Sequence, residues 1–228
     1  MIPVSISDAD INLSIPSAVQ IVLSEIKYFI VEDLRTARRF LKKVNKNIDI
    51  DALTFFVLNK HTDKREIESF IQPLTKGSNI GLMSEAGVPG VADPGAEIVA
   101  LAHDNNIQVV PLTGPSSIVL ALSASGLNGQ NFVFHGYLPI KQHERIRKIG
   151  RIEDYSKKNR QTQIFIETPY RNNQLIKDIL DTCRSETKLC IACNISAENE
   201  FIKTKRINQW QKEIPDFHKQ PAVFLLQA

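Results

Sequence analysis

The stretch from Ser84 to Gly95 reads SEAGVPGVADPG, with three glycines, two prolines and two carboxylates. An apolar run, IGLM, precedes it, and an amphipathic run, AEIVALAHDN, follows it. Glycines let the backbone approach a ligand closely, and prolines stiffen a loop, which reduces the entropy that is lost on binding. We therefore interpret the stretch as a rigid loop between a strand and a helix.

Strand-like and helix-like patterns alternate on both sides of this loop. Apolar runs predict strands over 28–31, 53–59, 79–84 and 107–112. Helical periodicity and capping signals predict helices over 17–27, 35–45, 63–77 and 95–105. This alternation indicates a mostly parallel sheet with helices on both of its faces.

A second loop of small residues, TGPSS (113–117), follows the strand expected over 107–112, and a helix is expected behind it. In open α/β sheets, ligands bind outside the carboxyl ends of the strands, so both loops belong to the ligand edge. The spacing of Gly87, Gly90 and Gly95 fits neither a phosphate-binding P-loop nor a dinucleotide fingerprint. The pattern thus predicts a ligand site at these two loops but does not identify the ligand.

The second half of the chain has strands closer together, with fewer helices between them. Strands are expected over 131–139, 162–167, 188–196, 200–207 and 221–228, and helices over 141–160 and 170–183. We therefore expect two α/β domains, residues 1–127 with a mostly parallel sheet and residues 128–228 with a mixed or antiparallel sheet.

The cysteines and the apolar runs argue against a metal site and against a membrane span. Cys190 and Cys193 lie three residues apart on a predicted strand, where side chains at this spacing point to opposite faces. The longest apolar stretch, IVLALSAS, is far shorter than the ~20 residues that span a bilayer. No signal peptide is visible, and we expect a cytoplasmic protein without bound metal.

Charged residues suggest further roles. Asp93 precedes Pro94 and Gly95, so we expect it to cap the following helix. Two basic segments, 35–46 and 141–160, could bind a phosphate backbone or could simply be solvated helix faces. The candidates for nucleic-acid binding are Arg35, Arg38, Arg39, Lys42, Arg145 and Lys148.

Three stretches, SEAGVPGVADPG, VVPLTGPSSIVLALSASGL and FHGYLP, resemble in order and spacing the tetrapyrrole methylase superfamily of S-adenosylmethionine-dependent methyltransferases. The branch that they resemble most is the small-subunit ribosomal RNA ribose 2′-O-methyltransferase I group, which FIVED (29–33) and IFIETPYR (164–171) also support. The resemblance implies S-adenosylmethionine as cofactor, held in a cleft between two α/β domains. It also implies a homodimer and ribosomal RNA of the small subunit as partner.

The resemblance also implies which residues contact the cofactor. In the first domain they are Pro3, Glu85, Gly87, Val88, Gly114, Pro115, Ser116 and Ser117. In the second domain they are Ile166, Glu167, Ala192, Cys193, Asn194, Pro221 and Ala222. A ribose hydroxyl needs a base at some stage of the transfer, and Glu85 and Glu167 are the candidates, unless alignment alone suffices.

Some positions depart from the family pattern. Cys193 and Asn194 replace an Arg-Glu pair, Glu85 replaces an aspartate, and the strand before Pro3 is almost absent. Three functions therefore stay open: methylation of ribosomal RNA, methylation of a corrin or porphyrin precursor, and cofactor binding without catalysis.

Overall fold

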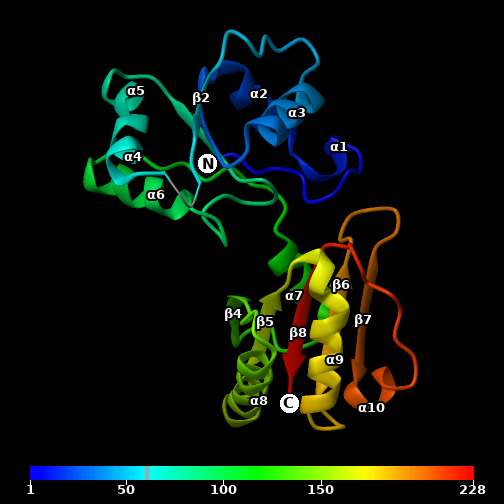
Figure 1. The fold of residues 1–228 in the computed structure, drawn as a ribbon. Helices are drawn as coiled ribbons and strands as arrows, with labels where there is room; N and C mark the ends of the chain where they lie inside the picture. Colours follow the sequence, from blue (N-terminus) through cyan, green and yellow to red (C-terminus); the bar gives the residue numbers. More distant parts are fainter. Residues whose placement is uncertain (60–61) are drawn as a thin grey trace. The chain divides into compact units, whose positions relative to one another are not determined.

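The computed structural model describes residues 1–59 and 62–228, which form two compact units, Met1–Ser116 and Ser117–Ala228. Each unit consists of a sheet covered by helices (Figure 1), so the expected α/β class is confirmed. Residues 117–127, which the sequence analysis assigns to the first domain, lie in the second compact unit.

The N-terminal unit contains a three-stranded parallel sheet in the order β2-β1-β3. Its strands are β1 (Tyr28–Val31), β2 (Thr54–Val57) and β3 (Ile80–Met83). Its helices are α1 (Ile11–Ser14), α2 (Ser17–Glu25), α3 (Leu34–Val44), α4 (Lys64–Phe70), α5 (Gln72–Thr75) and α6 (Gly95–Asp104). The three strands are parallel, so their carboxyl ends lie on one edge of the sheet.

Alternating side chains of β1 build two cores, one on each face of this sheet. Phe29 and Val31 pack with residues of α2 and α3 in one cluster. Ile30 packs with Leu82 and with residues of α4 and α6 in the other. Both faces are therefore apolar, which explains why the strand at 28–31 reads as a continuous apolar run.

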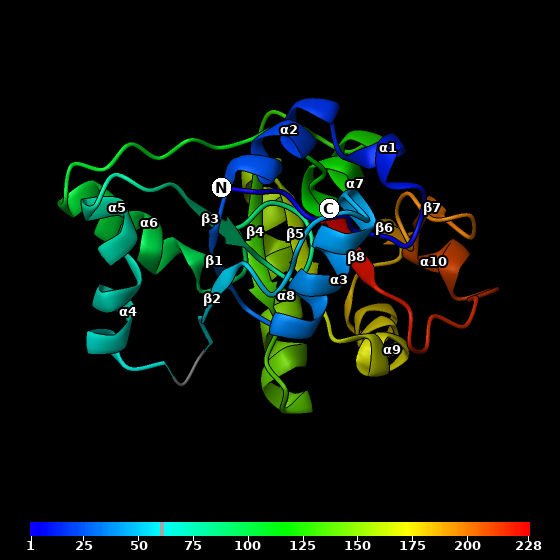
Figure 2. The same ribbon diagram turned by 90° about the horizontal axis from the view of Figure 1, so that it is seen from above.

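Two local predictions in this unit need correction. The expected strand over 107–112 is not formed. Among the described residues, this segment has only two backbone hydrogen bonds of the kind that pair strands, and both are with Met1. Figure 2 shows the segment after α6 as a long trace without strand. The single helix expected over 63–77 is divided into α4 and α5, since Pro73 has no N–H to continue it.

The C-terminal unit contains a mixed five-stranded sheet in the order β4-β5-β8-β6-β7. Its strands are β4 (Phe132–Tyr137), β5 (Thr162–Ile166), β6 (Lys188–Cys193), β7 (Phe201–Arg206) and β8 (Ala222–Gln227). Its helices are α7 (Ser117–Ser125), α8 (Gln142–Asn159), η1 (Pro169–Arg171), α9 (Asn172–Thr182) and α10 (Ile207–Trp210). β4 runs parallel to β5, and the other pairs are antiparallel, as the sequence predicts.

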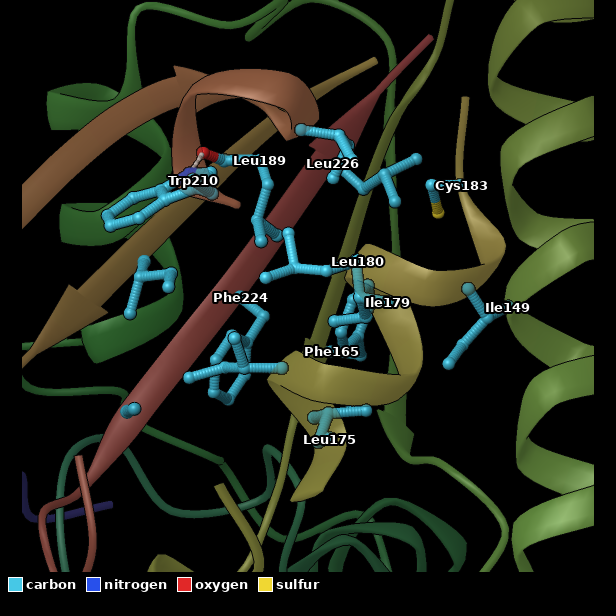
Figure 3. Packing of buried hydrophobic residues seen from close by; sticks show 14 of the residues in the cluster. Ile149, Phe165, Leu175, Ile179, Leu180, Cys183, Leu189, Trp210, Phe224 and Leu226 are labelled. Atoms are coloured by element: carbon cyan, nitrogen blue, oxygen red, sulfur yellow. Dashed lines mark hydrogen bonds between the residues drawn. The ribbon is translucent and has the colours of Figure 1, made fainter. Parts of the chain in front are cut away.

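The core of this unit lies between the sheet and helices α8, α9 and α10 (Figure 3). The rings of Phe165 and Phe224 stack across β5 and β8 with centroids 5.9 Å apart. Trp210 is fully buried, and its indole N–H donates a hydrogen bond to the Leu189 carbonyl at 2.9 Å. The only tryptophan of the chain thus joins α10 to β6.

A buried ion pair connects α8 to α9. Arg145 is 4% exposed and lies 2.6 Å from Asp178, which is 2% exposed. Desolvation alone would raise the pKa of Asp178, but hydrogen bonds from Gln142, Arg145 and Gln174 outweigh it and lower this pKa. Arg145 also donates to the carbonyls of Pro139 and Ile140, so its donors are used inside the fold.

We predict that Asp178→Ala lowers the free energy of unfolding by about 3–5 kcal/mol, because it leaves the Arg145 charge buried without its partner. Urea unfolding followed by circular dichroism measures this loss. Glu186→Ala is the control, since its pair with Arg206 is exposed and should contribute less than about 1 kcal/mol. Equal losses in the two variants would contradict the prediction.

Candidate functional site

The carboxyl edge of the parallel sheet carries polar side chains after two neighbouring strands. Asp33 follows β1 and accepts a hydrogen bond from the Thr36 amide at 2.7 Å, which caps α3 and lowers the pKa of Asp33. Glu32, Ser84 and Asp93 line a narrow hollow at this edge. Glu32 and Ser84 are absent from the predicted site. The strand order, which brings the end of β1 beside the end of β3, is what places them together.

Hydrogen bonds from its own backbone hold the loop from Ser84 to Gly95 in shape. The Asp93 carboxylate accepts bonds from the Gly90 amide at 2.8 and 3.0 Å and from the Gly95 amide at 2.7 Å. Gly95 is the first residue of α6 and Pro94 holds its N-cap position, so Asp93 is not the N-cap that the sequence predicts, although it accepts the first amide of the helix. Gly90 has φ +84°, a conformation in which glycine carries no steric penalty.

Three segments distant in sequence meet beside this loop. Val4 and Gly87 exchange two backbone hydrogen bonds, of 2.8 and 2.9 Å. A Cβ at Gly114 would lie 2.1 Å from the Cβ of Pro3, and a Cβ at Gly87 would lie 3.5 Å from the Pro115 carbonyl oxygen. The structure therefore brings together Pro3, Gly87, Gly114 and Pro115, which we call the loop cluster.

The other predicted contacts of this unit differ in exposure. Glu85 is exposed, whereas Val88 and Ser116 are half-buried. Ser117 is the first residue of α7 and belongs to the C-terminal unit.

In the C-terminal unit, Glu167 follows β5 and is buried. Its Oε1 accepts hydrogen bonds from the Thr168 amide at 2.6 Å and from Arg171 at 2.5 and 3.0 Å. Its Oε2 is buried and has no partner among the described residues. Arg171 is four residues after Glu167 in the sequence. The short helix η1 between them turns the chain back, so the Arg171 side chain reaches the Glu167 carboxylate.

The ends of β6 and β8 lie next to each other. Cys193 pairs with Ala222, and the Asn194 amide donates to the Pro221 carbonyl at 3.0 Å. Gln220 accepts bonds from the Asn194 side chain at 2.7 Å and from the Cys193 thiol at 3.4 Å. The antiparallel ladders thus bring together the predicted residues at the end of β6 and the start of β8.

The neighbouring ladder places the end of β5 beside β8. Ile166 pairs with Val223, which also pairs with Ala192 on β6. The predicted residues Ile166 and Ala192 therefore flank β8 from its two sides.

Two residues of this edge are missing from the sequence-based list. The Asn172 side chain donates to the carbonyls of Phe217 and Gln220, and its Oδ1 is buried without a partner in the part of the chain that is described. Gln220 joins Asn172 to Asn194. A polar residue directly before an apolar final strand is the signal that could have indicated Gln220.

The basic candidates divide into exposed and buried groups. Arg35, Arg38, Arg39 and Lys42 on α3 are exposed, although Arg38 lies over the Phe55 ring at 5.5 Å. Lys148 is half-buried, and Arg145 is buried in its pair with Asp178. The prediction that Arg145 contacts a nucleic acid does not fit this burial, whereas the four candidates on α3 stay exposed.

The three cysteines are free and buried. Cys193 points into the core of α8, α9 and α10, and Cys190 lies on the opposite face of β6, as the spacing predicts. Within the described ranges, no group of three or more His, Cys, Asp or Glu could hold a metal ion. No helix in those ranges is long and apolar enough to span a bilayer.

Comparisons with known proteins find related sequences and related folds. The model of the family described as Tetrapyrrole (Corrin/Porphyrin) Methylases matches residues 16–210. Ribosomal RNA small subunit methyltransferase I of Vibrio cholerae is 34% identical over 182 residues, which are 80% of this chain and 60% of that protein. The chain therefore spans less than two thirds of this relative.

Two solved structures share the fold. The methyltransferase CobJ has a TM-score of 0.62 at 12% identity, covering 94% of this chain and 88% of that one. Uroporphyrin-III C-methyl transferase from Thermus thermophilus, complexed with S-adenyl homocysteine, has a TM-score of 0.52 at 17% identity. The match covers 96% of this chain and 92% of that one.

We predict that the thiols of the native protein react slowly with a disulfide reagent at pH 8. Burial raises the pKa of Cys193 to about 11, so at pH 8 about one Cys193 in a thousand is thiolate. Absorbance after addition of dithionitrobenzoate measures the rate, and the reaction should speed up as the pH rises toward 11. The urea-unfolded chain is the control, and equally fast labelling before and after unfolding would refute the burial.

Proposed function

This chain belongs to the tetrapyrrole (corrin/porphyrin) methylase family, and we propose that it transfers a methyl group from S-adenosylmethionine to a ribose 2′-oxygen of small-subunit ribosomal RNA. The name of the Vibrio cholerae relative supports the RNA substrate. The loop cluster is the observation that carries the proposal, because it provides a preformed backbone surface at the ligand edge of the sheet.

The loop cluster fits an adenosyl sulfonium. Gly87 and Gly114 carry no side chain at the points where the three segments meet, so Val4 and Pro3 pack directly against the two loops and hold them together. The prolines and the Asp93 bonds fix the loops before binding, which lowers the entropic cost of binding. Mostly apolar contacts with a few polar anchors are typical of cofactor sites.

The C-terminal unit carries predicted cofactor contacts of its own. Glu167 Oε2 and Asn172 Oδ1 are buried acceptors without partners in the described chain, and an unpaired buried acceptor costs stability. A hydrogen-bond donor of the bound cofactor would satisfy them. Asn194 takes the place of the family's glutamate, and its side chain is held by Gln220.

In methyl transfer, the cofactor supplies an electrophilic methyl group on a sulfonium, and the protein supplies position and electrostatics. The rigid loops would align the acceptor oxygen, an effect that can contribute several kcal/mol, up to ~7–11. Glu85 is exposed and can accept a proton from a ribose hydroxyl. Glu167 can do so only through Oε2, because Arg171 and the Thr168 amide occupy Oε1.

The exposed basic face of α3 would bind the RNA backbone. This helix carries five basic residues and no acidic one between Leu34 and Val44. Such a face attracts phosphates independently of sequence, and its contribution falls as salt rises. We further propose that the protein acts in the cytoplasm, where its ribosomal substrate is assembled, and that it works as a homodimer.

We predict that Gly114→Ala weakens the binding of S-adenosylhomocysteine at least about tenfold in titration calorimetry. The added methyl group would overlap the Pro3 ring and displace one segment of the loop cluster. Gly129→Ala is the matched control, because a Cβ there meets no atom within 4 Å. If wild-type protein binds no S-adenosylhomocysteine at all, the proposed cofactor is wrong.

We also predict that the protein transfers labelled methyl from S-adenosylmethionine to unmodified small ribosomal subunits. The triple change Arg35→Gln, Arg39→Gln and Lys42→Gln should lower RNA affinity and reduce the steepness of its salt dependence. Lys76→Gln, Lys177→Gln and Lys212→Gln remove the same charge from scattered exposed positions and serve as the control. Cofactor binding without label in the RNA would exclude this substrate.

A further inference from the structure

A tyrosine, a histidine and a lysine lie together at the edge of the C-terminal unit. Tyr170 is 69% exposed, and His218 and Lys219 are exposed beside it. The rings of His218 and Tyr170 meet edge to face, with centroids 5.8 Å apart and an angle of 77° between the ring planes. The Lys219 ammonium lies over the Tyr170 ring, 5.8 Å from its centroid. We call these three residues the tyrosine platform.

Backbone contacts bring the two parts of the platform together. Tyr170 is the middle residue of η1, and Pro169 restricts the start of this short helix. The Lys219 amide donates to the Pro169 carbonyl at 2.9 Å, which ties the segment before β8 to η1. Lys219 has φ +62°, a left-handed conformation that lysine seldom adopts. The backbones of Tyr170 and Lys219 are therefore held next to each other before any ligand binds.

The platform lies on the same edge of the sheet as the predicted cofactor contacts of this unit. Tyr170 follows Glu167 after the end of β5, and Lys219 precedes the start of β8. β5 and β8 are antiparallel, and Ile166 pairs with Val223, so the end of one strand lies beside the start of the other. A molecule bound on Tyr170 would therefore lie at the edge that also carries Glu167.

The charges around the platform favour an anion. The Lys219 ammonium is near the outer limit of about 6 Å at which an aromatic face attracts a cation, so it can turn toward a stronger partner. The carboxylate of Asp216 lies beside His218, but its Oδ1 already accepts hydrogen bonds from the Asn173 side chain and the His218 amide. A phosphate is a suitable partner for Lys219.

The exposed ring selects the form of the nucleic acid. Aromatic side chains bind single-stranded RNA by stacking on its bases, and neighbouring cations contact its backbone. A base inside a duplex is covered on both faces by its neighbours and cannot stack on Tyr170, whereas an unstacked base of a loop can. A protein partner could also cover a tyrosine, but it would not need a cation beside the ring.

We infer that the tyrosine platform binds one unstacked nucleobase of single-stranded RNA, with the base on the Tyr170 ring and its phosphate next to Lys219. His218 supports the ring from its side. Because it rests on the proposed function, the platform adds one requirement to it: the RNA near the methyl acceptor must be unpaired. It also gives the C-terminal unit a part in RNA binding that does not involve the basic face of α3.

The experiment measures how tightly the full chain binds a fluorescein-labelled single-stranded oligoribonucleotide and the same RNA annealed to its complement. Tyr170→Ala should weaken the binding of the single strand at least about fivefold, because one base loses its stacking partner. Tyr170→Phe keeps the ring and should stay within about twofold of the wild type. Neither change should alter the affinity for the duplex.

Two further variants test the position and the charge. Tyr155→Ala is the matched control, since Tyr155 is 63% exposed on α8 of the same unit, and it should leave the affinity unchanged. Lys219→Gln should weaken binding and lower the slope of log affinity against log salt by about 0.7, as expected for one phosphate contact on a single strand. Photocrosslinking of RNA that contains iodouridine should label the peptide with Tyr170.

Equal losses in Tyr170→Ala and Tyr155→Ala would overturn the inference, and so would equal losses for single strand and duplex. Failure of the wild type to bind the single strand would overturn it as well. None of these readouts requires S-adenosylmethionine. Methyl transfer to ribosomal subunits together with unchanged RNA binding by Tyr170→Ala would therefore refute the platform and leave the proposed function standing.

Discussion

The contact between Pro3 and Gly114 fixes the arrangement of the ligand edge in the N-terminal unit. No side chain fits at position 114, because the proline ring occupies the space where its Cβ would lie. The Val4–Gly87 bridge holds the same N-terminal segment against the loop after β3. Two glycines in separate loops therefore allow one short segment to tie both loops together. The parallel order of the strands makes this possible, since their loops emerge at a common edge.

Much of the fold could be read from the sequence where local chemistry and tertiary context agree. The loop from Ser84 to Gly95 combines turn residues with a strand before it and a helix after it, and the structure has both. The alternation of strands and helices predicted the parallel sheet, and the closer strands of the second half predicted the mixed one. Residues 107–112 have the pattern of a strand but form none, because a strand also needs a neighbour with which to pair.

Charge was harder to interpret than fold. Arg145 stands in a segment rich in basic residues, and periodicity alone does not reveal that an aspartate 33 positions later reaches it. Asn172 and Gln220 were missed for a related reason, because their roles come from hydrogen bonds to backbone carbonyls and amides brought close by the fold.

The position of Trp210 has a consequence for how the molecule can be observed. It is the only tryptophan, it is buried in the core of the C-terminal unit, and Lys205 lies over its ring. Its fluorescence therefore reports the unfolding of that unit, and a partial opening of the N-terminal sheet would leave the emission unchanged. Tyr28 at the start of β1 belongs to the other unit, but the remaining tyrosines, Tyr137, Tyr155 and Tyr170, lie in the same unit as Trp210. Tryptophan emission compared with the heat absorbed by the whole chain would show whether the halves of the protein melt in one step or in two.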